Sequence, residues 1–91
     1  MEVQRKRIDS LDTKLIEILG ARQRAVKKIG IYKAKNNIPT LQVARFQEVM
    51  SRTIEAGQKQ GLAPEFVARL MTAIHVESLR IEDSLRSGTG Q

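Results

Sequence analysis

The chain has 91 residues and a formal net charge of +6, with no cysteine and a single histidine, His75. This excludes disulfides, thiolate metal sites and cysteine nucleophiles, and it argues against a histidine-based metal site. The N-terminus has no apolar signal segment and no run of about 18 apolar residues occurs, so we expect one cytoplasmic domain with no membrane partner. The surplus of positive charge suits the binding of nucleic acid, of an acidic membrane surface or of a small anionic substrate.

The first predicted element is a long helix. The segment from about Val3 to Asn36 has no proline, and it predicts one helix of roughly 30 residues and about 45 Å. Such a helix is longer than a globule of this size is wide. We therefore expect a second copy of the chain along it, in an intertwined homodimer. Its apolar stripe has three-four spacing and consists of Ile8, Leu11, Leu15, Ile18, Ala25, Ile29 and Tyr32.

Two further helices follow, and no segment alternates as a strand would. Proline and glycine mark the breaks between them, because proline cannot continue a helix and glycine favours turns. We expect an all-α domain over residues 1–86, with a long, a short and a medium helix. In chain order the elements are a break at Asn36–Thr40, a helix at about Leu41–Glu55, a turn at Gly57–Gly61, a helix from Pro64 to about Leu85 and a disordered tail at 87–91.

Arg22 interrupts the apolar seam of the first helix, where heptad spacing from Ile8 calls for a core residue. A guanidinium left unpaired in a dry interior costs several kcal/mol. It must therefore meet a carboxylate from the protein or from a ligand, or reach the solvent edge. Lys33 lies 11 residues further on nearly the same face, about 16 Å along the axis. Arg5 lies too far away to join them within one chain, but an antiparallel partner helix would bring it there.

Polar residues also occupy apolar faces in the later helices. Gln42 and Arg45 are three residues apart and share a face of the second helix. In the third helix, an apolar stripe through Met71 continues as Ser78 and Glu82. A stripe that turns polar either frays into solvent or borders a polar cavity. His75 is expected to be structural or solvent-facing.

Five segments of the sequence carry a family pattern: RKRIDSLDTKLIEILGAR at 5–22, IGIYK at 29–33, IPTLQVAR at 38–45, GLAPEF at 61–66 and IHVESL at 74–79. Each motif is weak alone, but the ordered set with its spacing is specific. Over about Arg5 to Leu85 the set resembles the all-helical, type II chorismate mutases. The branch with glutamine at the start of the second helix, often fused to 3-deoxy-7-phosphoheptulonate synthase, is the most similar.

The resemblance implies a homodimeric enzyme that rearranges chorismate to prephenate without cofactor or metal. Two departures from the family pattern stand out: Phe46 replaces a frequent glutamate, and Glu82 replaces a common glutamine. The resemblance implies that Arg22 binds a substrate carboxylate, with Arg45 beside it and Arg5 reaching over from the partner. It implies that Lys33 and Glu82 donate to the ether oxygen and that Lys33 also contacts a carboxylate. It places Gln42 at the ring hydroxyl and Ser78 near a carboxylate.

The chemistry agrees with this set of residues. Chorismate is a dicarboxylate, and its rearrangement needs a compact conformer and donors for the ether oxygen, not a nucleophile. Two alternatives share the fold: an isochorismate-pyruvate lyase, and a non-catalytic dimerisation or regulatory domain. A helical DNA-binding module would need its basic residues on one exposed face. Here the charges are spread along the chain, so we expect no nucleic-acid partner.

Overall fold

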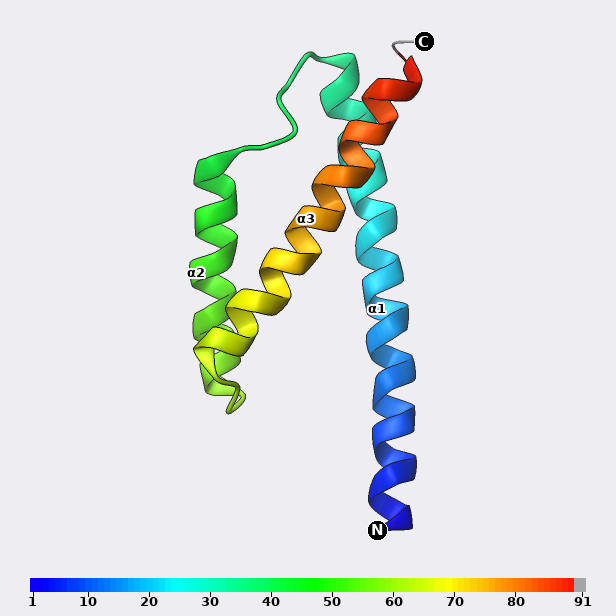
Figure 1. Ribbon diagram of the computed structural model, residues 1–91, viewed down its shortest axis with the longest axis vertical. Coiled ribbons are helices and arrows are strands. Elements are labelled where there is room, and N and C mark those ends of the chain that lie inside the picture. The colour runs from blue at the N-terminus through cyan, green and yellow to red at the C-terminus, as the bar shows by residue number, and fades with distance from the viewer. Residues whose placement is uncertain (90–91) are drawn as a thin grey trace.

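The computed structural model describes the backbone of residues 1–89 and the side chains of residues 1–86. It contains three helices, α1 (Glu2–Lys35), α2 (Val43–Lys59) and α3 (Pro64–Thr89), and no strand within that range. The predicted all-α class and the order long, short, medium are therefore confirmed for one chain. In Figure 1, α3 runs diagonally from α2 to the C-terminal half of α1. Within the described residues α3 packs on both other helices, whereas α1 and α2 do not pack on each other.

Helix α1 is continuous, as predicted, and ends at the predicted break. Asn37 adopts a left-handed conformation, with φ 55°. The Ile38 N–H then donates to the Lys33 carbonyl at 2.9 Å. This is a Schellman ending with asparagine in the position that glycine usually fills.

Helix α2 differs from its predicted bounds at both ends. It begins at Val43 rather than Leu41 because Gln42 is extended, with φ −121° and ψ 97°. It runs past Glu55 to Lys59, so Gly57 lies inside the helix and is buried there. A Cβ at Gly57 would lie 2.7 Å from Val67 Cγ2. The glycine therefore serves close approach of α3 rather than a turn.

The turn between α2 and α3 is made by Gly61, whose φ is 81°. The Leu62 N–H donates to the Gly57 carbonyl at 2.9 Å, which completes a second Schellman ending. Helix α3 begins at Pro64, as predicted, but it continues to Thr89 instead of ending near Leu85. Disorder of the tail at 87–91 stays a prediction, and residues 90–91 lie outside the described part of the chain.

The single chain is elongated and has a thin core. Its extents are 53 × 25 × 15 Å and its radius of gyration is 16.1 Å, against about 12 Å for a compact domain of this length. Among the described residues, the buried apolar side chains are Val26, Val67 and Ile81. The N-terminal end of α1 extends past the other two helices (Figure 1). In the described range, no helix has both the length and the apolar content needed to cross a membrane.

Candidate functional site

The three helices enclose a cavity of about 340 Å³. Six of the seven residues predicted for the site lie in its wall, and they come from all three helices. They are Arg22, Lys33, Gln42, Arg45, Ser78 and Glu82. The apolar part of the wall includes Val26 and Ile29 of α1, Phe46, Val49 and Met50 of α2, and Met71 and Leu79 of α3.

Arg22 meets a hydroxyl in this cavity rather than a carboxylate. Its Nη1 donates to Ser78 Oγ at 3.0 Å, and Ser78 Oγ donates to the Ile74 carbonyl at 2.9 Å. Ser78 is buried, so the hydroxyl is held in place from both sides. No acidic side chain of the described residues forms an ion pair with Arg22. The cation on the apolar seam thus lacks the counter-charge that its partly buried position calls for.

Lys33 and Glu82 form an ion pair at the other end of the polar wall. Lys33 Nζ lies 2.8 Å from Glu82 Oε1, with side-chain exposures of 12% and 8%. Lys33 Nζ also donates to the Thr40 carbonyl at 2.8 Å. Gly30 makes this packing possible, because a Cβ there would lie 3.1 Å from Glu82 Cγ and 3.3 Å from its Cα. The ammonium is therefore fixed before any ligand arrives.

Gln42 and Arg45 lie on the open side of the cavity. Both residues are exposed in the single chain. Arg45 Nη1 donates to Glu48 Oε1 at 2.6 Å, and these two side chains are 59% and 60% exposed. An ion pair so open to water holds its partners weakly. Arg45 can therefore turn from Glu48 to an anion in the cavity at little cost.

His75, expected to be structural or solvent-facing, also lines the cavity. Its ring packs against Phe46, with centroids 4.1 Å apart and planes tilted by 31°. Burial lowers the pKa of His75, and the charges of Arg22 and Lys33 lower it further, while Glu82 opposes them. Helical spacing could have revealed the position, since residues 75, 78 and 82 share one face of α3.

Arg5 is the predicted site residue that the single chain does not bring to the cavity. It lies 17 residues before Arg22, about 25 Å away along α1. Its side chain is 66% exposed and lies 3.7 Å from Glu2 Oε1. Within one chain Arg5 is a solvated surface residue.

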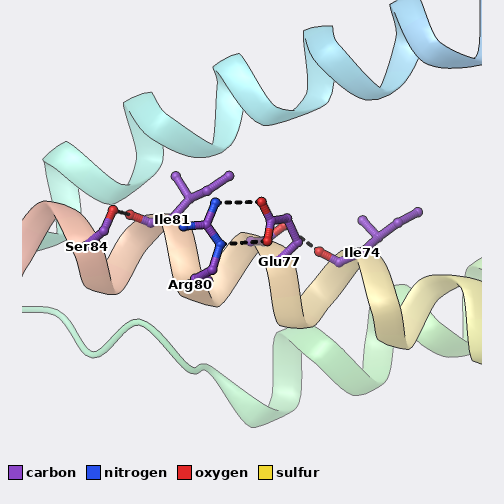
Figure 2. A network of polar contacts seen from close by, with 6 residues as sticks. Ile74, Glu77, Arg80, Ile81 and Ser84 are labelled. Atoms are coloured by element: carbon purple, nitrogen blue, oxygen red, sulfur yellow. Dashed lines mark hydrogen bonds and ion pairs between the residues drawn. The ribbon is translucent and has the colours of Figure 1, made fainter.

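A second polar group on α3 is unrelated to the cavity. Figure 2 shows Arg80 donating through two nitrogens to both carboxylate oxygens of Glu77, each at 2.7 Å. Neither residue is in the cavity wall. The hydrogen bonds from Arg80 lower the pKa of Glu77, and Glu77 raises that of Arg80. This is a surface pair along one helix.

The cavity has the character of an anion site. Its wall carries three cationic side chains, those of Arg22, Lys33 and Arg45, against one carboxylate, that of Glu82. Over the described range, no group of three or more His, Asp or Glu side chains could hold a metal ion. The cations and the hydroxyl can bind and orient a small molecule with two carboxylates, and the partly buried position of Arg22 and Lys33 strengthens such contacts.

Comparisons with known proteins agree with this chemistry. The family model described as chorismate mutase type II matches residues 4–83. The 4-amino-4-deoxychorismate mutase of Streptomyces pristinaespiralis is 28% identical over 83 residues, covering 91% of this chain and 64% of the relative. Two bifunctional chorismate mutase/prephenate dehydratases of Buchnera aphidicola, from Acyrthosiphon pisum and Schizaphis graminum, are 28% and 27% identical over 81 residues. The chain covers just under two thirds of the first relative and 21% of the other two.

Proposed function

The chain belongs to the type II chorismate mutase family, and from this premise we propose that it converts chorismate to prephenate. The reaction is intramolecular: the ether C–O bond breaks while a new C–C bond forms. No group of the protein enters the bond changes. The protein's part is to hold the reactive conformer and to stabilise the charge that grows on the ether oxygen.

The observation that carries the proposal is that Arg22 has no carboxylate partner among the described residues. A partly buried guanidinium whose side-chain partner is the Ser78 hydroxyl is poised to take a carboxylate from a ligand. Chorismate brings two carboxylates. A protein-internal ion pair at this position would have favoured a structural role for the arginine.

We assign the site roles on this basis. Lys33 has three N–H donors, of which one is used by the Thr40 carbonyl, and its ammonium lies 2.8 Å from the Glu82 carboxylate, so a donor remains for the ether oxygen. We place Glu82 beside the same oxygen, together with Lys33. The remaining roles are carboxylate binding by Arg22 and Arg45 with Ser78 near a carboxylate, contact of Gln42 with the ring hydroxyl, and a further carboxylate contact by Arg5 of the partner protomer.

A homodimer supplies that partner protomer. The apolar stripe of α1 is open to water in the single chain, with Leu11 53%, Leu15 51% and Ile18 64% exposed. Pairing with a second α1 would cover it and bring the N-terminal end of each α1 to the other cavity. We further infer that the chain belongs to the synthase-fused branch, because Gln42 stands at the start of the second helix. A cytoplasmic location is a separate part of the proposal and does not rest on Gln42.

One relative favours a second candidate substrate. The Streptomyces protein is named for 4-amino-4-deoxychorismate, which has an amine in place of the ring hydroxyl. The same rearrangement on that compound would use the same cations. A lyase acting on isochorismate and a non-catalytic domain are the remaining alternatives.

One experiment separates these possibilities. The purified chain is mixed in turn with chorismate, 4-amino-4-deoxychorismate and isochorismate. The loss of the absorbance of each compound is followed, and the products are separated by chromatography. We expect prephenate as the product. Release of pyruvate and salicylate from isochorismate would indicate the lyase. Absence of turnover with every one of the three compounds would indicate a non-catalytic domain.

A further inference from the structure

The face of α3 that borders the cavity has three polar positions in a row. Glu82, Ser78 and His75 follow one another at intervals of four and three residues, spanning about 10 Å along the helix axis. Glu82 is paired with Lys33 and Ser78 with Arg22. Each of the first two positions therefore has a cation of α1 opposite it, ready for the acidic part of a substrate.

His75 faces α2 instead. Its ring lies against Phe46 at 4.1 Å, and Phe46 is one helical turn from Gln42, whose carbonyl accepts the Phe46 N–H at 3.0 Å. His75 and Gln42 thus border the same end of the cavity, on either side of one aromatic ring. If one carboxylate lies at Arg22 and the ether oxygen at Lys33, the ring hydroxyl of the substrate lies at this end.

We propose that His75 is a specificity-determining residue, whose imidazole accepts a hydrogen bond from the ring hydroxyl of the substrate and favours it over the amine analogue. This inference rests on the proposed mutase function. Phe46 holds the ring on one face and leaves its nitrogens for the ligand. With one ring N–H, the neutral imidazole has one nitrogen that can accept.

The charges around His75 explain both the acceptor state and the preference. Arg22 and Lys33 of α1, together with burial, lower the pKa of His75, and Glu82 of α3 opposes them only in part. Arg45 of α2 is a further cation in the wall. The ring is therefore neutral at neutral pH and accepts from a hydroxyl. An ammonium at the same place would lie among these cations with no free carboxylate beside it, so it is disfavoured.

The test compares chorismate and 4-amino-4-deoxychorismate as substrates for three forms of the protein. The wild type should have the higher kcat/KM for chorismate. His75→Leu should lower kcat/KM for chorismate about tenfold, as expected for one lost hydrogen bond, and should affect the amine much less. Phe46→Glu places a carboxylate beside the same end and should move the preference toward the amine by about tenfold or more. Helical content by circular dichroism checks that each variant is folded.

A pH series adds a readout that a packing role would not change. For the wild type, kcat/KM for chorismate should fall as the pH drops below the ordinary histidine range and the imidazole loses its acceptor. His75→Gln keeps an acceptor that does not titrate, so it should retain activity and lack this acidic decline. The inference is overturned if kcat/KM rises on acidification, if His75→Leu affects both substrates equally, or if the wild type prefers the amine. Absence of turnover with either substrate would instead overturn the proposed function.

Discussion

At the scale of single residues, the site depends on one cation of its wall, Arg22, that has no carboxylate partner among the described residues. Arg22 donates to a hydroxyl and is left for a ligand, whereas Lys33 is fixed by Glu82 and the Thr40 carbonyl. The two cations therefore have different tasks. We propose that Arg22 selects for a carboxylate and that Lys33 supplies a donor where the reaction needs one.

Replacement of Arg22 by alanine should lower kcat/KM for chorismate by about a hundredfold or more, since a charged contact with the substrate is lost. The helical signal in circular dichroism should be retained, because no ion pair inside the chain is broken. Arg24→Ala removes an exposed arginine two residues away on the same helix and serves as the matched control. An unchanged rate for Arg22→Ala would show that this arginine does not contact the substrate.

Glu82 carries the second prediction at this scale. A carboxylate beside the ether oxygen repels the developing negative charge, whereas a neutral amide of the same shape can donate to it. Glu82→Gln should therefore raise kcat for chorismate severalfold, as measured by steady-state kinetics. Glu77→Gln, on the same helix but outside the cavity wall, is the matched control and should leave kcat unchanged. An unchanged kcat for Glu82→Gln would place Glu82 away from the ether oxygen.

At the scale of the helices, two buried glycines set how closely α3 approaches its neighbours. Gly57 brings α2 against Val67, and Gly30 brings α1 against Glu82. The second contact lies directly under the site. The spacing of the functional side chains on α1 and α3 thus depends on a residue that has no side chain.

Gly57→Ala should reduce the free energy of unfolding by about 1–3 kcal/mol, as overpacking of a tight contact does. The new Cβ would lie 2.7 Å from Val67, a buried side chain with little room to move. Gly20→Ala is the control, because its Cβ would meet only Arg24 Nη1 at 3.4 Å. That variant should gain about 0.5–1 kcal/mol from the helix preference of alanine. Urea unfolding measures both, and an equal or greater stability of Gly57→Ala would contradict the close contact.

At the scale of the whole molecule, the single chain is long, thin and open. Its extent of 53 Å is set by α1 alone, and the N-terminal half of that helix has no other helix beside it (Figure 1). An apolar stripe exposed over several turns is a protein interface far more often than a water-facing surface. Pairing with a second copy would make the dimer more compact than the single chain and would close the open side of the cavity.

The trans role of Arg5 can be tested by mixing two inactive variants. Arg5→Ala and Arg22→Ala should each have low activity as homodimers, and sedimentation should give twice the mass of the 10.2 kDa chain. In a mixed dimer, the site with an intact Arg22 receives an intact Arg5 from the other chain. Unfolding and refolding the two variants together in equal amounts should restore about a quarter of the wild-type activity, since half of the dimers are mixed and each has one intact site. A mixture as inactive as its components would place Arg5 outside the site.

The sequence by itself determined the helices and marked several polar residues of the cavity wall, because both follow from local rules, while the family resemblance supplied the roles of the site residues. Helices run where proline is absent, as it is up to Asn36, and the prolines at 39 and 64 mark the breaks between them. Periodicity places Arg22, Ser78 and Glu82 on otherwise apolar helix faces, where a polar residue needs a polar partner or a ligand. The tertiary structure alone decided that Gly57 continues α2, that Glu82 pairs with Lys33, and that His75 enters the cavity. These outcomes depend on which helix crosses at each point. Such contacts join residues far apart in the chain, and no local preference for glycine, glutamate or histidine encodes them.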